Sequence, residues 1–204
     1  KTLFPHTTLF RSRTLFRNIT INIEEGDKIA LVARNGSGKS TLMKIIAGLD
    51  TADSGTVWVH KDIRTVMLQQ DHDFDGNKTI WDNVLRLDNP VVKVVKAYEQ
   101  FLEEGLDDHD KLADLMASLD DNNAWTFESD LKQILGKLNL HHLNEKVGNL
   151  SGGQKKRVAL AQALIEAQLH EGRCLLILDE PTNHLDVSMI EWLEEYLSAQ
   201  KITL

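Results

Sequence analysis

The feature that most constrains the fold is a glycine-rich stretch, residues 33–41 (ARNGSGKST). It follows a short apolar run at residues 29–32, which predicts a buried parallel strand. It precedes apolar residues at helical spacing, and Gly48 lies where that helix would end. A strand, a glycine-rich turn and a helix N-terminus in this order predict a phosphate-binding loop.

The chemistry of such a loop explains its residue types. Successive backbone N–H groups can surround a phosphate only where side chains do not intrude, and the helix dipole adds positive potential. We expect Lys39 to reach the β- and γ-phosphates and Ser40 to bind Mg²⁺. Ala33 stands where the motif has its first glycine. The residues expected to contact nucleotide are Asn35, Gly36, Ser37, Gly38, Lys39, Ser40 and Thr41.

A second diagnostic stretch is LSGGQ, residues 150–154, which opens another helical pattern. Ser151 is a good N-cap, and the glycines after it leave backbone N–H groups exposed at a positive helix end. This arrangement predicts an anion site. The three basic residues at 155–157 are interpreted as a solvated or interdomain surface.

A third stretch is the apolar strand expected at residues 174–178, which ends in Asp179 and Glu180. The carboxyl ends of strands in an open α/β sheet are where ligands bind. Asp179 is suited to hold Mg²⁺, and Glu180 to polarise an attacking water. Cys174 has apolar neighbours, so we expect a buried structural thiol.

The remaining pattern predicts an α/β fold with a mainly parallel core sheet, an antiparallel β subdomain and a helical subdomain. The helical subdomain is expected at about residues 79–168, with an acidic helical hairpin as an arm-like insert and an apolar stripe from Trp125 to Leu138 in its core. His141 and His142 are interpreted as surface loop residues. Strands are expected at residues 19–23, 56–59, 63–68 and 201–204, and a helix is expected from Ser188.

Composition limits the setting in which the chain works. No apolar run reaches the ~20 residues of a membrane-spanning helix, and no signal-peptide pattern is present. We therefore expect a cytoplasmic protein that has no membrane partner. The net charge of −8 gives no general attraction to nucleic acid, so any such contact must be local. Residues 2–12 (TLFPHTTLFRS) resemble a translated sequencing adapter, so we treat residues 1–12 as a non-native segment.

The phosphate loop, Gln70, LSGGQ and the Asp-Glu strand, in that order, resemble an ATP-binding cassette domain. The stretch from Asp179 to Asp186 (DEPTNHLD) and the basic continuation of LSGGQ resemble the ABC-F group. The helical insert with Trp125 resembles the N-terminal cassette of an Uup-like member. The likeness covers residues 13–204, which we expect to form a single cassette truncated at both ends.

The resemblance implies roles for particular residues. Gly36, Gly38 and Lys39 to Thr41 match the Walker A motif, and Gln70 matches the Q-loop glutamine that senses Mg²⁺ and the γ-phosphate. Asp179 and Glu180 match Walker B and its catalytic glutamate. The implied magnesium ligands are Ser40, Gln70 and Asp179. The implied signature residues, which act on the ATP of another cassette, are Ser151, Gly152, Gly153 and Gln154.

The resemblance also implies partners and an activity. These are ATP, Mg²⁺, a second cassette of the same full-length chain or of a homodimer, and the ribosome, with DNA as a further partner by family analogy. We expect ATP hydrolysis that is weak in this chain alone. Two alternatives stay open, which are the ATPase subunit of a membrane transporter and a nucleotide-gated binding module with little turnover.

Overall fold

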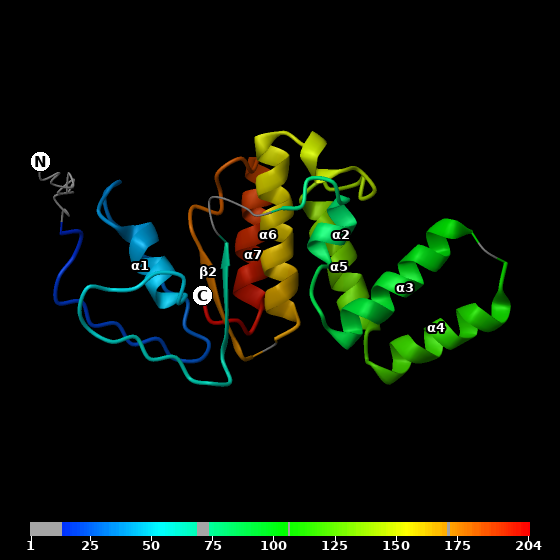
Figure 1. The fold of residues 1–204 in the computed structure, drawn as a ribbon, viewed down its shortest axis with the longest axis horizontal. Helices are drawn as coiled ribbons and strands as arrows, with labels where there is room; N and C mark the ends of the chain where they lie inside the picture. The colour runs from blue at the N-terminus through cyan, green and yellow to red at the C-terminus, as the bar shows by residue number, and fades with distance from the viewer. Residues whose placement is uncertain (1–13, 69–73, 106, 171) are drawn as a thin grey trace, which may run out of the picture.

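The computed structural model describes residues 14–68, 74–105, 107–170 and 172–204. The expectations for residues 1–12 and for Gln70 therefore lie outside the described residues. Figure 1 shows helix α1 (Lys39–Ile46) and long loops at one end of the molecule and a helical hairpin at the other. The strands and two long helices lie between these ends.

The sheet of the described chain has two parallel strands, β1 (Arg64–Leu68) and β2 (Cys174–Leu178). They pair in register from Arg64 with Cys174 to Leu68 with Leu178. A single parallel bridge joins Leu175 to Thr203, and Leu204 exchanges backbone hydrogen bonds of 2.7 and 2.8 Å with Ile29 and Asp27. Side by side, the backbones therefore lie in the order β1, β2, residues 203–204 and residues 27–29. The last of these segments comes shortly before the glycine-rich loop in the chain and so connects that loop to the sheet.

Seven α-helices and one 3₁₀ helix are described. Besides α1, they are α2 (Ile80–Val84), α3 (Pro90–Glu104), α4 (His109–Asp121), α5 (Trp125–Lys137), η1 (Val147–Asn149), α6 (Gly152–Gln168) and α7 (Val187–Ala199). The predicted helical region after residue 79 and the helix near Ser188 are confirmed, the latter beginning one residue earlier. His141 and His142 are exposed in a loop, as expected.

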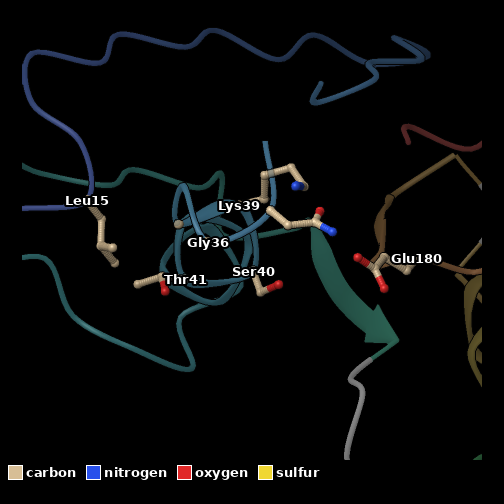
Figure 2. A pocket seen from close by; sticks show the side chains of 8 residues that line it. Leu15, Gly36, Lys39, Ser40, Thr41 and Glu180 are labelled. Atoms are coloured by element: carbon tan, nitrogen blue, oxygen red, sulfur yellow. The ribbon is translucent and has the colours of Figure 1, made fainter. Parts of the chain in front are cut away.

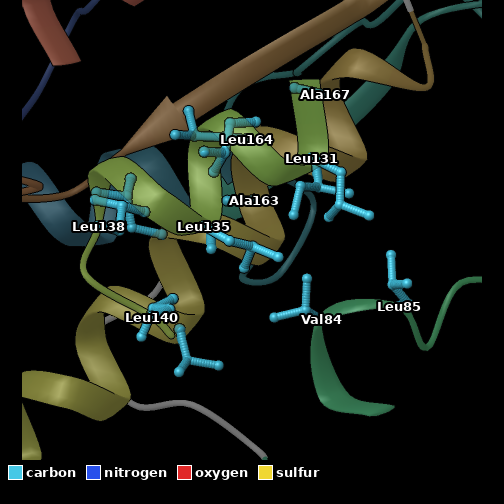
Figure 3. Close-up of a cluster of buried hydrophobic side chains, with 14 of the residues drawn as sticks. Val84, Leu85, Leu131, Leu135, Leu138, Leu140, Ala163, Leu164 and Ala167 are labelled. Atoms are coloured by element: carbon cyan, nitrogen blue, oxygen red, sulfur yellow. The ribbon is translucent and has the colours of Figure 1, made fainter. Parts of the chain in front are cut away.

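Helix α6 is the centre of the core. Its residues from Val158 to Ile165 are all buried, so it is enclosed on all sides rather than amphipathic. Figure 3 shows side chains of α2, α5 and α6 meeting in one cluster, including Val84, Leu131 and Leu164. Burial of apolar surface at about 25 cal/mol per Å² makes this cluster the main source of the stability of the helical part.

Helices α3 and α4 form the predicted hairpin, which extends away from the core (Figure 1). The Asn89 side chain caps α3 by accepting from Val91 N–H at 2.8 Å, and Pro90 occupies the first turn, where no N–H is needed. Gly105 ends the helix with φ 59°, in the left-handed region that suits glycine. Asp108 then caps α4.

Ion pairs join helix α3 of the hairpin to neighbouring helices. Lys132 on α5 lies 3.0 Å from Glu99 Oε1 on α3 and also pairs with Glu128. Burial raises the pKa of Glu99, while the hydrogen bond to Glu128 raises the pKa of Lys132. Lys96 on α3 lies 2.5 Å from Asp82 on α2, and this hydrogen bond lowers the pKa of Asp82.

The expected antiparallel β subdomain is wrong for the described residues. Residues 19–23 and 56–59 form no strands, and neither do residues 29–32, which were expected to form a buried parallel strand. Apolar side chains of all three segments are exposed, including Ile21, Val32 and Trp58. The reason is that a strand needs the backbone of a neighbour, and among the described residues only Leu204 pairs with the 27–29 segment. At residues 63–68 the expected strand exists because β2 lies beside it.

None of the helices in the described ranges is both long and apolar enough to cross a membrane.

Candidate functional site

A cavity of about 310 Å³ lies between the glycine-rich loop and the end of β2. Figure 2 shows Lys39, Ser40 and Thr41 at the start of α1, with Glu180 on the opposite side. Its lining residues are Leu15, Asn35, Gly36, Gly38, Lys39, Ser40, Thr41 and Glu180. The structure therefore brings the first and third diagnostic stretches of the sequence to one site.

Two glycines give the loop its shape. Gly36 has φ 76° and Gly38 has φ 97°, a region that L side chains adopt at a cost. Gly38 is the N-cap of α1 and supplies no side-chain cap, so backbone N–H groups at this helix start are open to a ligand. The loop closes through a 3.2 Å hydrogen bond from Ser37 N to Arg34 O.

The Lys39 ammonium is folded back onto its own loop. Its Nζ donates to Ala33 O at 2.8 Å and to Arg34 O at 3.3 Å. These bonds place a positive charge on the rim of the cavity. The two carbonyls are neutral acceptors, so an anionic phosphate oxygen would compete for the ammonium successfully.

Leu15 is a cavity residue that the sequence did not point to. A Cβ built on Gly38 would lie 2.9 Å from Leu15 Cβ and 3.2 Å from Phe16 Cδ1. The residue at position 38 is therefore restricted by space as well as by φ. Leu15 lies 23 positions before Gly38, and nothing in the local pattern links the two.

Glu180 follows β2 directly and has an unusual backbone. Its φ is 50°, in the left-handed region. Its carboxylate Oε2 accepts a 2.7 Å hydrogen bond from Asn183 Nδ2, and its carbonyl accepts from Asn183 N at 3.2 Å. Asp179, one residue earlier, is 6% exposed, whereas Glu180 is exposed to the cavity.

The sequence contained one signal for Asn183, which is its position three residues after a carboxylate. Asparagine commonly bonds to nearby groups at such spacing in turns. The turn then leads to Asp186, the N-cap of α7. Met189 N–H donates to Asp186 Oδ1 at 2.9 Å and lowers the pKa of that carboxyl.

The LSGGQ residues lie elsewhere. They begin α6 with a reciprocal capping box, in which Gln154 N donates to Ser151 Oγ at 3.3 Å and Ser151 N donates to Gln154 Oε1 at 2.9 Å. Ser151, Gly152, Gly153 and Gln154 are not among the residues that line the cavity. His184 lies beside Gly153, where a Cβ would be 3.6 Å from His184 Cβ.

A metal ion here would need to be held by few protein groups. Among the described residues, no group of three or more histidine, cysteine, aspartate or glutamate side chains could enclose an ion. Ser40 and Glu180 nevertheless both line the cavity, and Asp179, which directly precedes Glu180 in the chain, is buried and is not among the lining residues. Mg²⁺ typically takes one or two such ligands together with phosphate oxygens and water, so these residues fit that ion.

The profile of the family described as "ABC transporter" matches residues 16–183, which is most of the chain. The chain belongs to this family of ATP-binding cassettes. Members of the family are ATPases in general. This cassette therefore has an α/β fold of the P-loop NTPase type, and the cavity lies at its glycine-rich loop.

Several relatives match nearly the whole cassette. The ATP-binding protein YfmR of Bacillus subtilis is 40% identical over 195 residues, 93% of this chain and 30% of its own. Uup of Haemophilus influenzae is 38% identical over 92% of this chain and 29% of its own. The energy-dependent translational throttle protein EttA of Mycobacterium tuberculosis is 32% identical over 92% of this chain and 34% of its own. Uup and EttA are ABC-F proteins. The cassette spans about a third of the length of these relatives.

Solved structures show the same fold. The RNase-L inhibitor matches 88% of this chain and 28% of its own at a TM-score of 0.53. An inward-facing metal-chelate type ABC transporter matches 90% of this chain and 61% of its own at 0.52. Both are 23% identical to the cassette, so they bear on its fold alone.

Proposed function

We propose that this cassette binds ATP with Mg²⁺ and hydrolyses it to ADP and phosphate. The observation that carries this proposal is the cavity in which the phosphate-binding loop and Glu180 face each other. The loop supplies backbone N–H groups and a lysine for the phosphates. Glu180 supplies a carboxylate on the opposite side, where a water attacking the γ-phosphate would be held and deprotonated.

Each side chain has a distinct task in this scheme. Lys39 leaves the Ala33 and Arg34 carbonyls and pairs with the β- and γ-phosphates, which exchanges neutral acceptors for charged ones. Ser40 and Asp179 would hold Mg²⁺, together with Gln70, which lies outside the described residues. The ion would neutralise phosphate charge. Asn35, Gly36, Gly38 and Thr41 line the cavity and, with Ser37 between them in the loop, would shape the phosphate cradle.

A second cassette completes the site in our proposal. The LSGGQ residues cap a helix whose N-terminus lies apart from the cavity of the same chain. Placed over the ATP of another cassette, this helix end would stabilise negative charge that develops in the transition state. We infer that turnover in this chain alone is weak and rises with chain concentration, because two copies must meet head to tail.

The binding half of the proposal is tested with K39A in the chain. We expect MgATP affinity to fall about tenfold to a hundredfold, because a charge-assisted hydrogen bond is lost. K44A is the matched control, since Lys44 lies exposed on the same helix. Equal affinity of K39A and the unmodified chain would refute the nucleotide site.

The catalytic half is tested with E180Q. We expect MgATP to remain bound while hydrolysis falls to a small residual rate, because an amide at this position accepts no proton from the water. A nucleotide-gated binding module, the non-enzyme alternative, would behave the same with and without the E180Q substitution. If E180Q and the unmodified chain release ADP and phosphate at the same rate, that alternative is therefore favoured.

We further propose that the cassette works in translation, the process to which the name of the relative EttA refers. We also propose that it does so in the cytoplasm. The ATP-trapped E180Q chain should sediment with ribosomes and K39A should not. Capture with a membrane permease would support the transporter alternative. Retention on branched DNA without ribosome binding would favour DNA as the partner.

A further inference from the structure

The turn after β2 has a strained and closely bonded geometry. Glu180 and His184 are both non-glycine residues in the left-handed region, with φ 50° and 72°. Such conformations are costly and persist only where surrounding contacts impose them. Here the side chain of Asn183 is hydrogen-bonded to Glu180, and His184 lies beside Gly153.

Asn183 holds Glu180 by two bonds of different kinds. Its backbone N–H donates to Glu180 O at 3.2 Å and closes the turn. Its side-chain Nδ2 donates to the carboxylate at 2.7 Å. The turn is therefore closed by the backbone bond, and the amide side chain is left to act on the carboxylate alone.

The side-chain hydrogen bond from Asn183 engages only one of the two oxygens of the Glu180 carboxylate. Asn183 engages Oε2, and the structure records no other hydrogen bond to the Glu180 carboxylate from the described residues. Oε1 therefore remains available to a water in the cavity. A glutamate side chain has three rotatable bonds and can adopt many orientations. Fixing Oε2 by a hydrogen bond leaves mainly those orientations in which Oε1 can reach the water.

We propose that Asn183 is a positioning residue, which orients Glu180 so that Oε1 faces the attacking water. This inference rests on the proposed role of Glu180 as the base. An amide suits the task because it donates without carrying charge and does not titrate, so it leaves the carboxylate free to accept a proton. Asn183 itself does not line the cavity.

The test compares N183A, N183D and N144A in single-turnover hydrolysis, with chain in excess over MgATP so that two copies can pair. We expect N183A to lower the rate about tenfold to a hundredfold, the cost of a misplaced catalytic group, with MgATP affinity unchanged within about twofold. N183D keeps the size but replaces the donor with a like charge, so the loss should be at least as large. N144A is the matched control, because Asn144 Nδ2 also donates to a glutamate, Glu103 Oε1 at 2.9 Å, on a surface far from the cavity. It should retain the full rate.

A double-mutant cycle separates positioning from a general structural role. If Asn183 acts only through Glu180, N183A should lower the rate in the unmodified chain and have no further effect in the E180Q background. An equal loss in both backgrounds, or a parallel loss of MgATP affinity in N183A, would overturn the proposal.

The same cycle distinguishes this inference from the proposed function. If E180Q itself hydrolyses ATP at the full rate, the role of Glu180 as base is wrong. If E180Q is slow and N183A is as fast as the unmodified chain, the base assignment stands and the positioning role is wrong. Should N183A fail to fold, as judged by thermal unfolding, N183D provides the same comparison with the side-chain volume kept.

Discussion

The contact between Gly76 and Gly148 allows a sharp test of the structure. Gly148 lies in η1, just before the LSGGQ segment, and its N–H donates to Gly76 O at 3.0 Å. A Cβ on Gly148 would lie 2.7 Å from Gly76 O, closer than real Cβ contacts. Because the obstructing atom belongs to the backbone, no side chain can rotate to relieve the clash. The two loops must separate.

The cost of G148A can be worked from these contacts. Overpacking costs about 1–3 kcal/mol, and the stretched hydrogen bond about 1 kcal/mol. Replacing glycine with alanine restricts the unfolded chain and returns up to about 1 kcal/mol. We therefore expect the free energy of unfolding to fall by about 2 kcal/mol. In a protein of this size that lowers Tm by about 4–8 °C in a thermal melt followed by circular dichroism.

The reciprocal substitution is the control. A Cβ on Gly76 would lie 3.4 Å from Gly148 Cα, which is close to ordinary contact. G76A should therefore stay within about 1 kcal/mol of the unmodified chain, because its packing cost and its entropic gain nearly cancel. If G148A melts at the same temperature as G76A, the result contradicts the close approach of Gly76 and Gly148.

Three further predictions follow from burial and charge. Leu164 is fully buried in α6, so L164A should lower the free energy of unfolding by about 2–5 kcal/mol, measured by urea denaturation. The hydrogen bond from Lys96 lowers the pKa of Asp82, so the stability from this pair is present above the usual aspartate pKa near 4 and is lost as pH falls through the lower folded-state value. K96A should therefore cost at most about 1 kcal/mol at pH 7 and less at pH 3, because the pair is partly exposed. Burial raises the pKa of Cys174 to about 12, so its thiol should resist alkylation at pH 8 until the chain unfolds, and rapid labelling of the folded chain would contradict its burial.

The helical part of the fold could be predicted because its signals are local. The caps Asp108 and Ser151 and the apolar residues of α6 specify helices within a few residues of sequence. The strands were harder to predict, because a strand exists only where another backbone pairs with it. The alternation around Ile21 is as regular as that of a strand, yet that segment forms none.

The candidate site likewise contains residues that could be predicted from the sequence and residues that could not. Lys39 and Glu180 could be assigned to one site from the sequence, because each lies in a short motif whose chemistry requires the other, and both line the cavity. Leu15 could not be found, because it reaches the cavity only through the path of the chain in space. The role proposed for Asn183 depends on a 2.7 Å contact that spacing alone does not fix.

The hairpin of α3 and α4 has a mechanical consequence. Helix α3 has 15 residues, which at 1.5 Å per residue makes it about 22 Å long. Ion pairs of Lys96 and Lys132 and the hydrogen bond from Asn144 to Glu103 hold α3 at several points along its length, while the connection between α3 and α4 lies away from the core (Figure 1). A tilt of about 10° about the first turn of α3, resisted by these contacts, would carry the last turn through about 4 Å, roughly the distance between consecutive Cα atoms.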